Sequence, residues 1–127
     1  EAARFDLDAT GRPVTVSGDR TLLRRLIRNL IENARRYAGN GPITVSVIAE
    51  AGRAVLEVSD HGPGVPAAER QRIFEPFYRL AGGSETGRGS GLGLALVLDI
   101  ARRHGGDAVC LAAESGGSRF RIDLPAA

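Results

Sequence analysis

The sequence predicts an α+β fold, a two-layer sandwich in which a mixed β-sheet carries about three helices on one face. Two stretches repeat apolar residues at helical spacing, and these predict the longer helices. Other stretches alternate apolar and polar residues and come in pairs around glycine-containing turns, which is typical of hairpins. A length of 127 residues suits one domain, so we expect residues 1–127 to form a single unit.

The first elements are two short strands and a long helix. Alternation predicts strands near Arg4–Leu7 and Val14–Ser17, and helical spacing predicts a helix over Arg20–Ala38. Asp19 suits its N-cap and Gly39 its end. The apolar stripe of this helix is expected to consist of Leu23, Leu26, Ile27, Leu30 and Ala34.

A hairpin is expected next. Residues 43–48 and 54–59 alternate around a tight turn at Ala51 and Gly52. A short helix at about Ala67–Ile73 is predicted after a glycine-containing loop. Residues 78–90 show no periodicity, and a loop of that length in a compact domain is usually functional or disordered.

The last elements are a helix and a second hairpin. The helix is predicted to start near Gly91 and to end at Gly105 and Gly106, with Leu96, Val97, Ile100 and Ala101 on its inner face. Strands are predicted at Val109–Ala112 and Arg119–Leu124, joined by a turn at Gly116 and Gly117.

Composition excludes several functions. The net charge of +2 gives no reason to expect nucleic acid or membrane binding, and no apolar run approaches the ~18 residues of a membrane helix. Cys110 has no partner for an internal disulfide, which suits a reducing compartment, and it is expected to be a small buried hydrophobe. Because the chain contains no Met, we expect it to be a piece of a longer protein.

Polar residues border the apolar stripe of the first helix. At about 100° per residue, Asn29, Asn33 and Arg36 fall in one band beside the stripe. One interpretation is that the two amides hydrogen-bond nearby backbone. The other is that an amide oxygen ligates Mg²⁺, which needs few protein ligands when phosphate oxygens complete its shell. Arg36 would then reach the same phosphates, and Tyr37 would flank a base.

Two glycine-containing segments allow a ligand to approach the backbone. Asp60 ends a strand and begins DHGPG, which is either an ordinary turn or a carboxylate that accepts from the amine of a base. The run GRGSGLG at 87–93 precedes a helix, whose free N–H groups suit phosphate. It is not a P-loop, because no Gly-Lys-Ser/Thr follows it.

As a set, four signatures resemble the N box, first glycine box, F box and second glycine box of sensor histidine kinase catalytic domains. They are NLIENARRY at 29–37, DHGPG at 60–64, FEPF at 74–77 and GRGSGLGLAL at 87–96. This family has a Bergerat-type ATP-binding fold and shares it with type II topoisomerase, heat-shock chaperone and mismatch-repair ATPases. The resemblance covers roughly residues 22–124.

The resemblance implies ATP and Mg²⁺ as cofactors and assigns a role to each motif. Asn33 is expected to hold Mg²⁺, Arg36 to contact phosphate, and Tyr37 to pack on adenine. Asp60 is expected to bind the adenine amine in a pocket shaped by Gly62 and Gly64. The F box, with Phe74 and Phe77, and the second glycine box would anchor the two ends of an ATP lid. The expected ligand contacts there are Phe77, Arg88, Gly89, Ser90, Gly91, Leu92 and Gly93.

Position 29 separates kinases from hydrolases in the related families. Hydrolysing relatives carry a glutamate there as general base, whereas this chain has Asn29, and an amide cannot take a proton from water. An imidazole acceptor needs no such base, so catalysis would depend on Asn33, Asn29 and Arg36 for positioning and charge. Neither His61, in a glycine loop, nor His104, at a helix end, has the setting of a phosphoacceptor.

The resemblance therefore implies the catalytic part of a protein histidine kinase in two-component signalling, without its phosphoacceptor dimerisation domain. Its partners would be its own helical dimerisation domain and, indirectly, a response regulator. It would be a cytoplasmic domain of a membrane-bound homodimer in the bacterial inner membrane. A nucleotide-binding regulator of the same fold without phosphotransfer, or a glycine-rich interaction domain without a ligand, are the alternatives.

Overall fold

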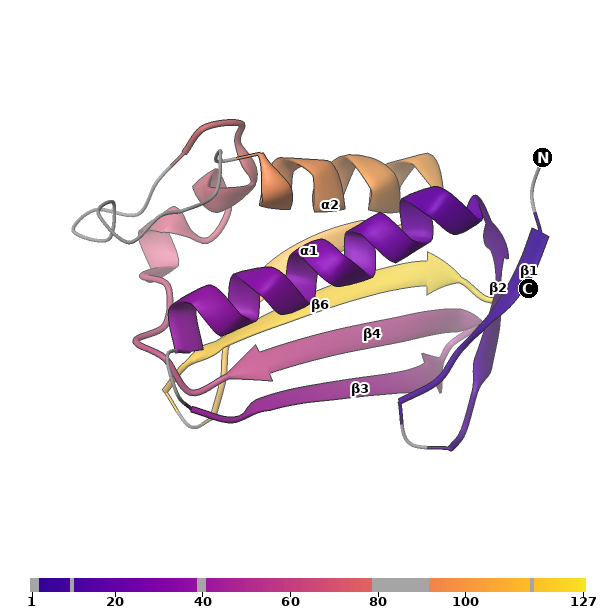
Figure 1. Cartoon of the computed structure of the whole chain (residues 1–127), viewed down its shortest axis with the longest axis horizontal. Coiled ribbons are helices and arrows are strands. Elements are labelled where there is room, and N and C mark those ends of the chain that lie inside the picture. The colour runs from indigo at the N-terminus through magenta and orange to yellow at the C-terminus, as the bar shows by residue number, and fades with distance from the viewer. Residues whose placement is uncertain (1–2, 10, 39–40, 79–91, 115) are drawn as a thin grey trace.

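The computed structural model describes residues 3–9, 11–38, 41–78, 92–114 and 116–127, which form two sheets and the helices that cover one of them (Figure 1). The strands are β1 (Ala3–Leu7), β2 (Val14–Gly18), β3 (Ile43–Glu50), β4 (Arg53–Asp60), β5 (Asp107–Ala112) and β6 (Ser118–Pro125). The helices are α1 (Arg20–Ala38), α2 (Gly93–Arg103) and the 3₁₀ turns η1 (Ala67–Glu69) and η2 (Arg72–Phe74).

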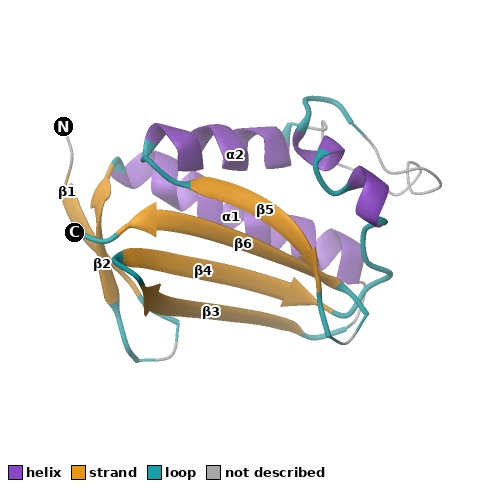
Figure 2. Ribbon diagram, turned by 180° about the vertical axis from the view of Figure 1, so that it is seen from behind, coloured by secondary structure: helices purple, strands orange, loops and turns teal. Residues whose placement is uncertain are grey.

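The α+β two-layer prediction is confirmed, but the described strands pair only in antiparallel fashion. β1 and β2 form a separate ribbon, and the larger sheet has the order β3-β4-β6-β5. The prediction of a mixed sheet was wrong in this respect. A parallel pair needs a long crossover connection, and the chain between β4 and β5 is long enough for one. However, β6 occupies the place beside β4, so β5 lies at the edge of the sheet (Figure 2).

The core lies between one face of the larger sheet and the two α-helices (Figures 1 and 2). Alternation along β4 places Ala54, Leu56 and Val58 on this face, each no more than 4% exposed. Leu26 and Leu30 of α1 pack into the same cluster. Burying apolar surface between the two layers stabilises the fold by roughly 25 cal/mol per Å².

Helix α1 has the predicted bounds, and its N-terminus has the predicted cap. The Leu22 backbone N–H donates to Asp19 Oδ1 at 3.0 Å, which satisfies one of the free donors of the first turn. Leu23, Leu26, Leu30 and Ala34 of the predicted stripe are buried, and Ile27 is partly buried. The proposed stop at Gly39 lies outside the described residues.

Helix α2 begins two residues later than predicted and ends where the glycines predicted it. Gly105 has a φ of +81°, and the Gly106 N–H donates to the Ala101 carbonyl at 2.9 Å. This is a glycine-dependent helix end, which closes the last turn with a left-handed residue. Of the predicted inner face, Val97, Ile100 and Ala101 are fully buried and Leu96 is partly buried.

The predicted short helix at 67–73 is instead the pair of 3₁₀ turns. Each turn is three residues long, and Ile73 and Phe74 of η2 are buried against the core. Tight single turns of this kind are common as connectors. None of the helices in the described ranges is long and apolar enough to cross a membrane.

Candidate functional site

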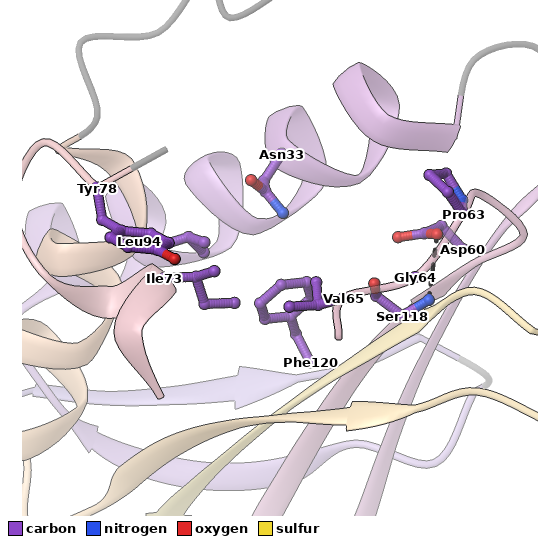
Figure 3. Close-up of a pocket in the computed structure, with 10 residues that line it drawn as sticks. All are labelled: Asn33, Asp60, Pro63, Gly64, Val65, Ile73, Tyr78, Leu94, Ser118 and Phe120. Atoms are coloured by element: carbon purple, nitrogen blue, oxygen red, sulfur yellow. Dashed lines mark hydrogen bonds between the residues drawn. The ribbon is translucent and has the colours of Figure 1, made fainter. Parts of the chain in front are cut away.

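A pocket of about 60 Å³ lies between α1 and the larger sheet, where five parts of the chain meet (Figure 3). Its lining comes from α1, from β4 and the loop after it, from η2 and the residues that follow, and from α2 and β6. The lining residues are Asn33, Asp60, Pro63, Gly64, Val65, Ile73, Tyr78, Leu94, Ser118 and Phe120. It therefore combines a mostly apolar wall with a few polar groups, which is the usual composition of a small-molecule site.

Asp60 is the buried carboxylate of this pocket. It is the last residue of β4, lies on the helix-facing side of the strand and is only 2% exposed. Its Oδ1 accepts from the Gly62 N–H at 2.9 Å and from the Ser118 N–H at 3.3 Å. Within the described residues, Oδ2 receives no hydrogen bond. One oxygen is thus held by backbone donors while the other is available to a ligand that donates a hydrogen bond.

Glycines allow the loops around Asp60 to pack closely. A Cβ on Gly117 would overlap the backbone of Asp60. Gly64 has a φ of +80°, and a Cβ there would lie 2.8 Å from the Gly116 carbonyl oxygen. The DHGPG loop and the β5–β6 turn therefore contact each other through backbone, which places the Ser118 N–H against the carboxylate.

Asn33 reaches the same pocket from α1. Its side chain is 8% exposed, although it lies on a helix whose neighbouring residues Glu32 and Arg35 are exposed. Figure 3 shows Asn33 directed toward the pocket, with Asp60 and Ser118 at one end and Tyr78 and Leu94 at the other. The structure therefore brings together the amide and the carboxylate that the motifs singled out.

The apolar wall suits a flat, uncharged group. Ile73 and Phe120 are buried, and Phe120 is held by an edge-to-face contact with Phe74, with ring centroids 6.2 Å apart. Aromatic and branched side chains arranged in this way present a rigid surface for a planar ring. A purine base has the shape and polarity that this wall and Asp60 would accommodate.

Tyr78 closes the pocket at the end away from Asp60. Its hydroxyl donates to Glu69 Oε1 at 2.5 Å, and the Arg72 guanidinium lies 5.8 Å from its ring centroid. The hydrogen bond to Glu69 raises the pKa of Tyr78, because it stabilises the neutral phenol. These contacts fix the position of the ring against the site.

Asn29 lies one helical turn before Asn33 but contacts another part of the molecule. Its Nδ2 donates to the Gly93 carbonyl at 3.3 Å, so it joins α1 to the first residue of α2. It does not line the pocket. Of the two interpretations given above for the amides, hydrogen bonding to backbone describes Asn29. The backbone group belongs to α2, which is far from Asn29 in sequence, and not to α1 itself.

Several other predicted site residues lie away from the pocket in this structure. Arg36 is exposed, because it lies three residues beyond Asn33 and nearer the solvent side of α1. Phe77 is 68% exposed, with a φ of +65° that is unusual for a residue other than glycine. Leu92 is 41% exposed and immediately precedes α2. Gly62 contributes its N–H to Asp60 rather than lining the pocket.

Arg88, Gly89, Ser90 and Gly91, and the side chain of Tyr37, lie outside the described part of the chain. Conversely, the motifs did not point to Tyr78 or Ser118, which line the pocket, or to Gly117, which packs on Asp60. For Ser118 and Gly117, the sequence does contain a signal, the run of small residues where β6 begins. That run can be linked to Asp60 only once β6 is known to lie beside β4.

Both histidine rings contact backbone groups, and neither lies in the helical setting expected of a phosphoacceptor. The Asp19 N–H donates to His104 Nε2 at 3.0 Å, while His104 Nδ1 lies 2.8 Å from the Ile100 carbonyl oxygen. A neutral ring that donates through Nδ1 satisfies both contacts. His61 is exposed, with Nδ1 3.2 Å from the Pro42 carbonyl oxygen.

Cys110 is 6% exposed, so the expectation of a small buried hydrophobe is confirmed. Burial raises the pKa of its thiol to about 11. At neutral pH the group is therefore protonated, and it is a poor nucleophile and metal ligand.

The donor set suits a hard cation held largely by a ligand. In the described ranges there is no cluster of three or more His, Cys, Asp or Glu side chains that would hold a metal alone. The Asn33 amide provides one hard oxygen at the pocket wall. That is sufficient for Mg²⁺, which usually keeps several waters and takes its remaining ligands from phosphate.

Comparison with known families matches most of the chain. Residues 18–127 match the model described as "Histidine kinase-, DNA gyrase B-, and HSP90-like ATPase". The sensor protein CutS of Streptomyces coelicolor is 41% identical over 129 residues. The match covers 98% of this chain and 31% of CutS, so the chain spans about a third of the length of that relative.

Solved structures show the same fold. The mycobacterial sensor histidine kinase MprB has a TM-score of 0.78 at 35% identity, over 90% of this chain and 76% of that one. Full-length ShkA, solved in complex with AMPPNP, has a TM-score of 0.76 at 31% identity, over 90% of this chain and 23% of ShkA.

Proposed function

Because the chain belongs to the family of histidine kinase-, DNA gyrase B- and HSP90-like ATPases, we propose that its pocket binds Mg-ATP for transfer of the γ-phosphoryl group to a histidine. The chain is the ATP-binding catalytic domain of a sensor histidine kinase. The acceptor histidine would belong to a separate helical dimerisation domain.

The observation that supports this proposal most directly is that Asp60 and Asn33 line the same pocket. They are 27 positions apart in the sequence, and the rest of the pocket lining is mostly apolar. Asp60 Oδ2 would accept from the exocyclic amine of adenine, while Oδ1 stays bound to the Gly62 and Ser118 N–H groups. The phosphates would then extend along α1 toward Asn33. AMPPNP in the related ShkA complex supports an adenine nucleotide as the ligand.

The residues suit phosphoryl transfer better than hydrolysis. Of the described residues that line the pocket, Asp60 is the one carboxylate, and its place in the deep end suits base recognition rather than activation of water. Transfer would form a bond from the acceptor nitrogen to the γ-phosphorus, break the bond to the β–γ bridging oxygen and release ADP. When bound at Asn33, Mg²⁺ neutralises charge on the phosphate oxygens. The chain's own part is to hold the nucleotide in line with the incoming imidazole.

The proposed partners follow from the sensor kinases that this chain resembles. They are the dimerisation domain of its own parent and, through it, a response regulator. The relatives are sensor proteins, so we propose a cytoplasmic place for this domain within a membrane-bound homodimeric parent. His104 is engaged at both ring nitrogens, which supports an acceptor outside this domain.

Nucleotide titration with and without Mg²⁺ tests binding, and a transfer assay tests the kinase step. We expect the chain to bind ATP with an affinity that rises when Mg²⁺ is added. Mixed with the dimerisation domain of its parent, it should produce phosphate that is labile in acid and stable in alkali. Binding without transfer would favour a nucleotide-binding regulator, and no binding would reject both functions.

Gly93→Ala is expected to weaken binding of ATP and ADP without reducing stability. Among the described residues, a Cβ at Gly93 would meet no atom within 4 Å beyond its chain neighbours and its own helix backbone, and alanine is a better helix former. The expected loss, about tenfold, would arise because phosphate at the start of α2 must approach the backbone closely. Calorimetric titration and thermal unfolding measure the two effects. Wild-type affinity in this variant would show that the phosphates do not approach α2 at this position.

A further inference from the structure

Asn29 is placed to set the position of α2 relative to α1. It lies four residues before Asn33 on the same side of α1, and its Nδ2 donates to the carbonyl of Gly93, the first residue of α2. Gly93 also ends the glycine-rich run and begins the first turn of α2, whose N–H groups have no partner within their own helix. One hydrogen bond therefore joins the helix that carries Asn33 to the helix start that would face phosphate.

Among the described residues, no side chain caps the first turn of α2. Its N-cap residue is Leu92, which makes no side-chain cap bond because leucine has no hydrogen-bonding atom. Helix α1, in contrast, is capped by Asp19. The first turn of a helix frays readily when it lacks a cap. A hydrogen bond from a neighbouring helix therefore has a larger effect on the position of an uncapped first turn than on that of a capped one.

The direction of the bond bears on the role of Asn29. A carbonyl only accepts, so the atom of Asn29 that faces Gly93 must be the N–H donor of the amide. Asn33 lines the pocket and Asn29 does not. The two amides of the NLIEN segment thus have different surroundings, one in the ligand pocket and one between two helices.

We propose that Asn29 is a positioning residue, which holds the start of α2 in register with Asn33 so that both reach the phosphates of one nucleotide. This inference rests on the proposed function. It assigns Asn29 a role through Gly93 rather than through the metal ion. Its chemical requirement is a hydrogen-bond donor at position 29, whereas a metal ligand requires an oxygen.

Two substitutions separate these requirements. Asn29→Ala removes the donor, and Asn29→Asp replaces the donor with an oxygen while keeping the size and shape of the side chain. If Asn29 is a positioning residue, both variants should bind ADP and ATP about three- to tenfold more weakly, which is the effect of one lost hydrogen bond. The loss should be equal in Mg²⁺ and in EDTA, and adenosine affinity should not change. Asn29→Gln, which keeps a donor, should recover part of the loss.

Hydrogen exchange on the nucleotide-free protein provides a second readout. The amides of the first turn of α2 should exchange faster in Asn29→Ala and Asn29→Asp than in the wild type, whereas Glu32→Gln on the exposed side of α1 should change neither exchange nor affinity. A loss confined to Mg²⁺, or wild-type affinity in Asn29→Asp, would show a metal ligand and overturn the proposal. So would unchanged exchange in α2. If the wild type binds no nucleotide, the proposed function fails, while the exchange data still test the link between the helices.

Discussion

Asp60→Asn is expected to lower ATP affinity by roughly 10- to 100-fold, the effect of a lost hydrogen bond to a charged group. The asparagine carbonyl would keep the bonds that Oδ1 accepts from the Gly62 and Ser118 N–H groups. Its NH₂ would then stand where Oδ2 is, opposite the adenine amine, so that two donors face each other. Guanine carries an acceptor at that position. The preference for ATP over GTP should therefore fall as well.

Competition binding with ATP and GTP measures this change, and Glu57→Gln is the matched control. Glu57 lies on the same strand three residues earlier, on the opposite face of the sheet, where it is 3.7 Å from Arg121. The same carboxylate-to-amide change there should leave both affinities at wild-type values. If Asp60→Asn kept the wild-type ATP affinity and circular dichroism showed an intact fold, Asp60 would not be the residue that recognises adenine.

Asn33→Ala is expected to abolish the increase in ATP affinity that Mg²⁺ produces and to slow phosphoryl transfer roughly 100-fold or more. The amide oxygen of Asn33 is the hard ligand that the pocket offers near the proposed phosphate position. Without it, the phosphate charge would be held less firmly in line with the acceptor. Binding of ATP in EDTA should change little, since the base contacts at Asp60 remain.

Titrations in Mg²⁺ and in EDTA, followed by transfer to the parent's dimerisation domain, test this expectation. Glu32→Gln is the control, because it alters the adjacent, exposed side chain of α1 and leaves the pocket unchanged. Asn33→Asp adds a stricter test, since it keeps an oxygen but adds charge beside the phosphates. Normal transfer by Asn33→Ala would exclude Asn33 as the metal ligand.

Much of the fold could be predicted from local patterns. The bounds of α1, the cap at Asp19 and the helix end at Gly105 follow from periodicity and from residues adjacent in sequence. The two 3₁₀ turns were predicted as one helix. Their segment is short and polar, and its periodicity is too weak to distinguish a helix from two separate turns. Strand order is decided over longer distances, and this is why the sheet was wrongly predicted to be mixed.

The candidate site was predictable only where local sequence patterns mark its residues. Asn33 and Asp60 stand out as an amide in a helix beside its apolar stripe and an acid that begins a glycine loop. Tyr78 does not stand out, since its place depends on contacts with Glu69 and Arg72 that form only when the chain folds back at η1 and η2. Asn29 was expected to act in catalysis together with Asn33 and Arg36, and its bond to Gly93 crosses 64 positions of sequence.

By itself, the sequence determined which segments become helices and strands and which polar residues lie at their edges, because side-chain periodicity and capping act within a few residues. Only the tertiary structure decided that β6 lies beside β4, and this pairing carries the Ser118 N–H to a carboxylate 58 positions away. The physical reason is that the pairing of distant strands is selected by the total apolar burial and hydrogen bonding of the whole sheet, which no single segment encodes.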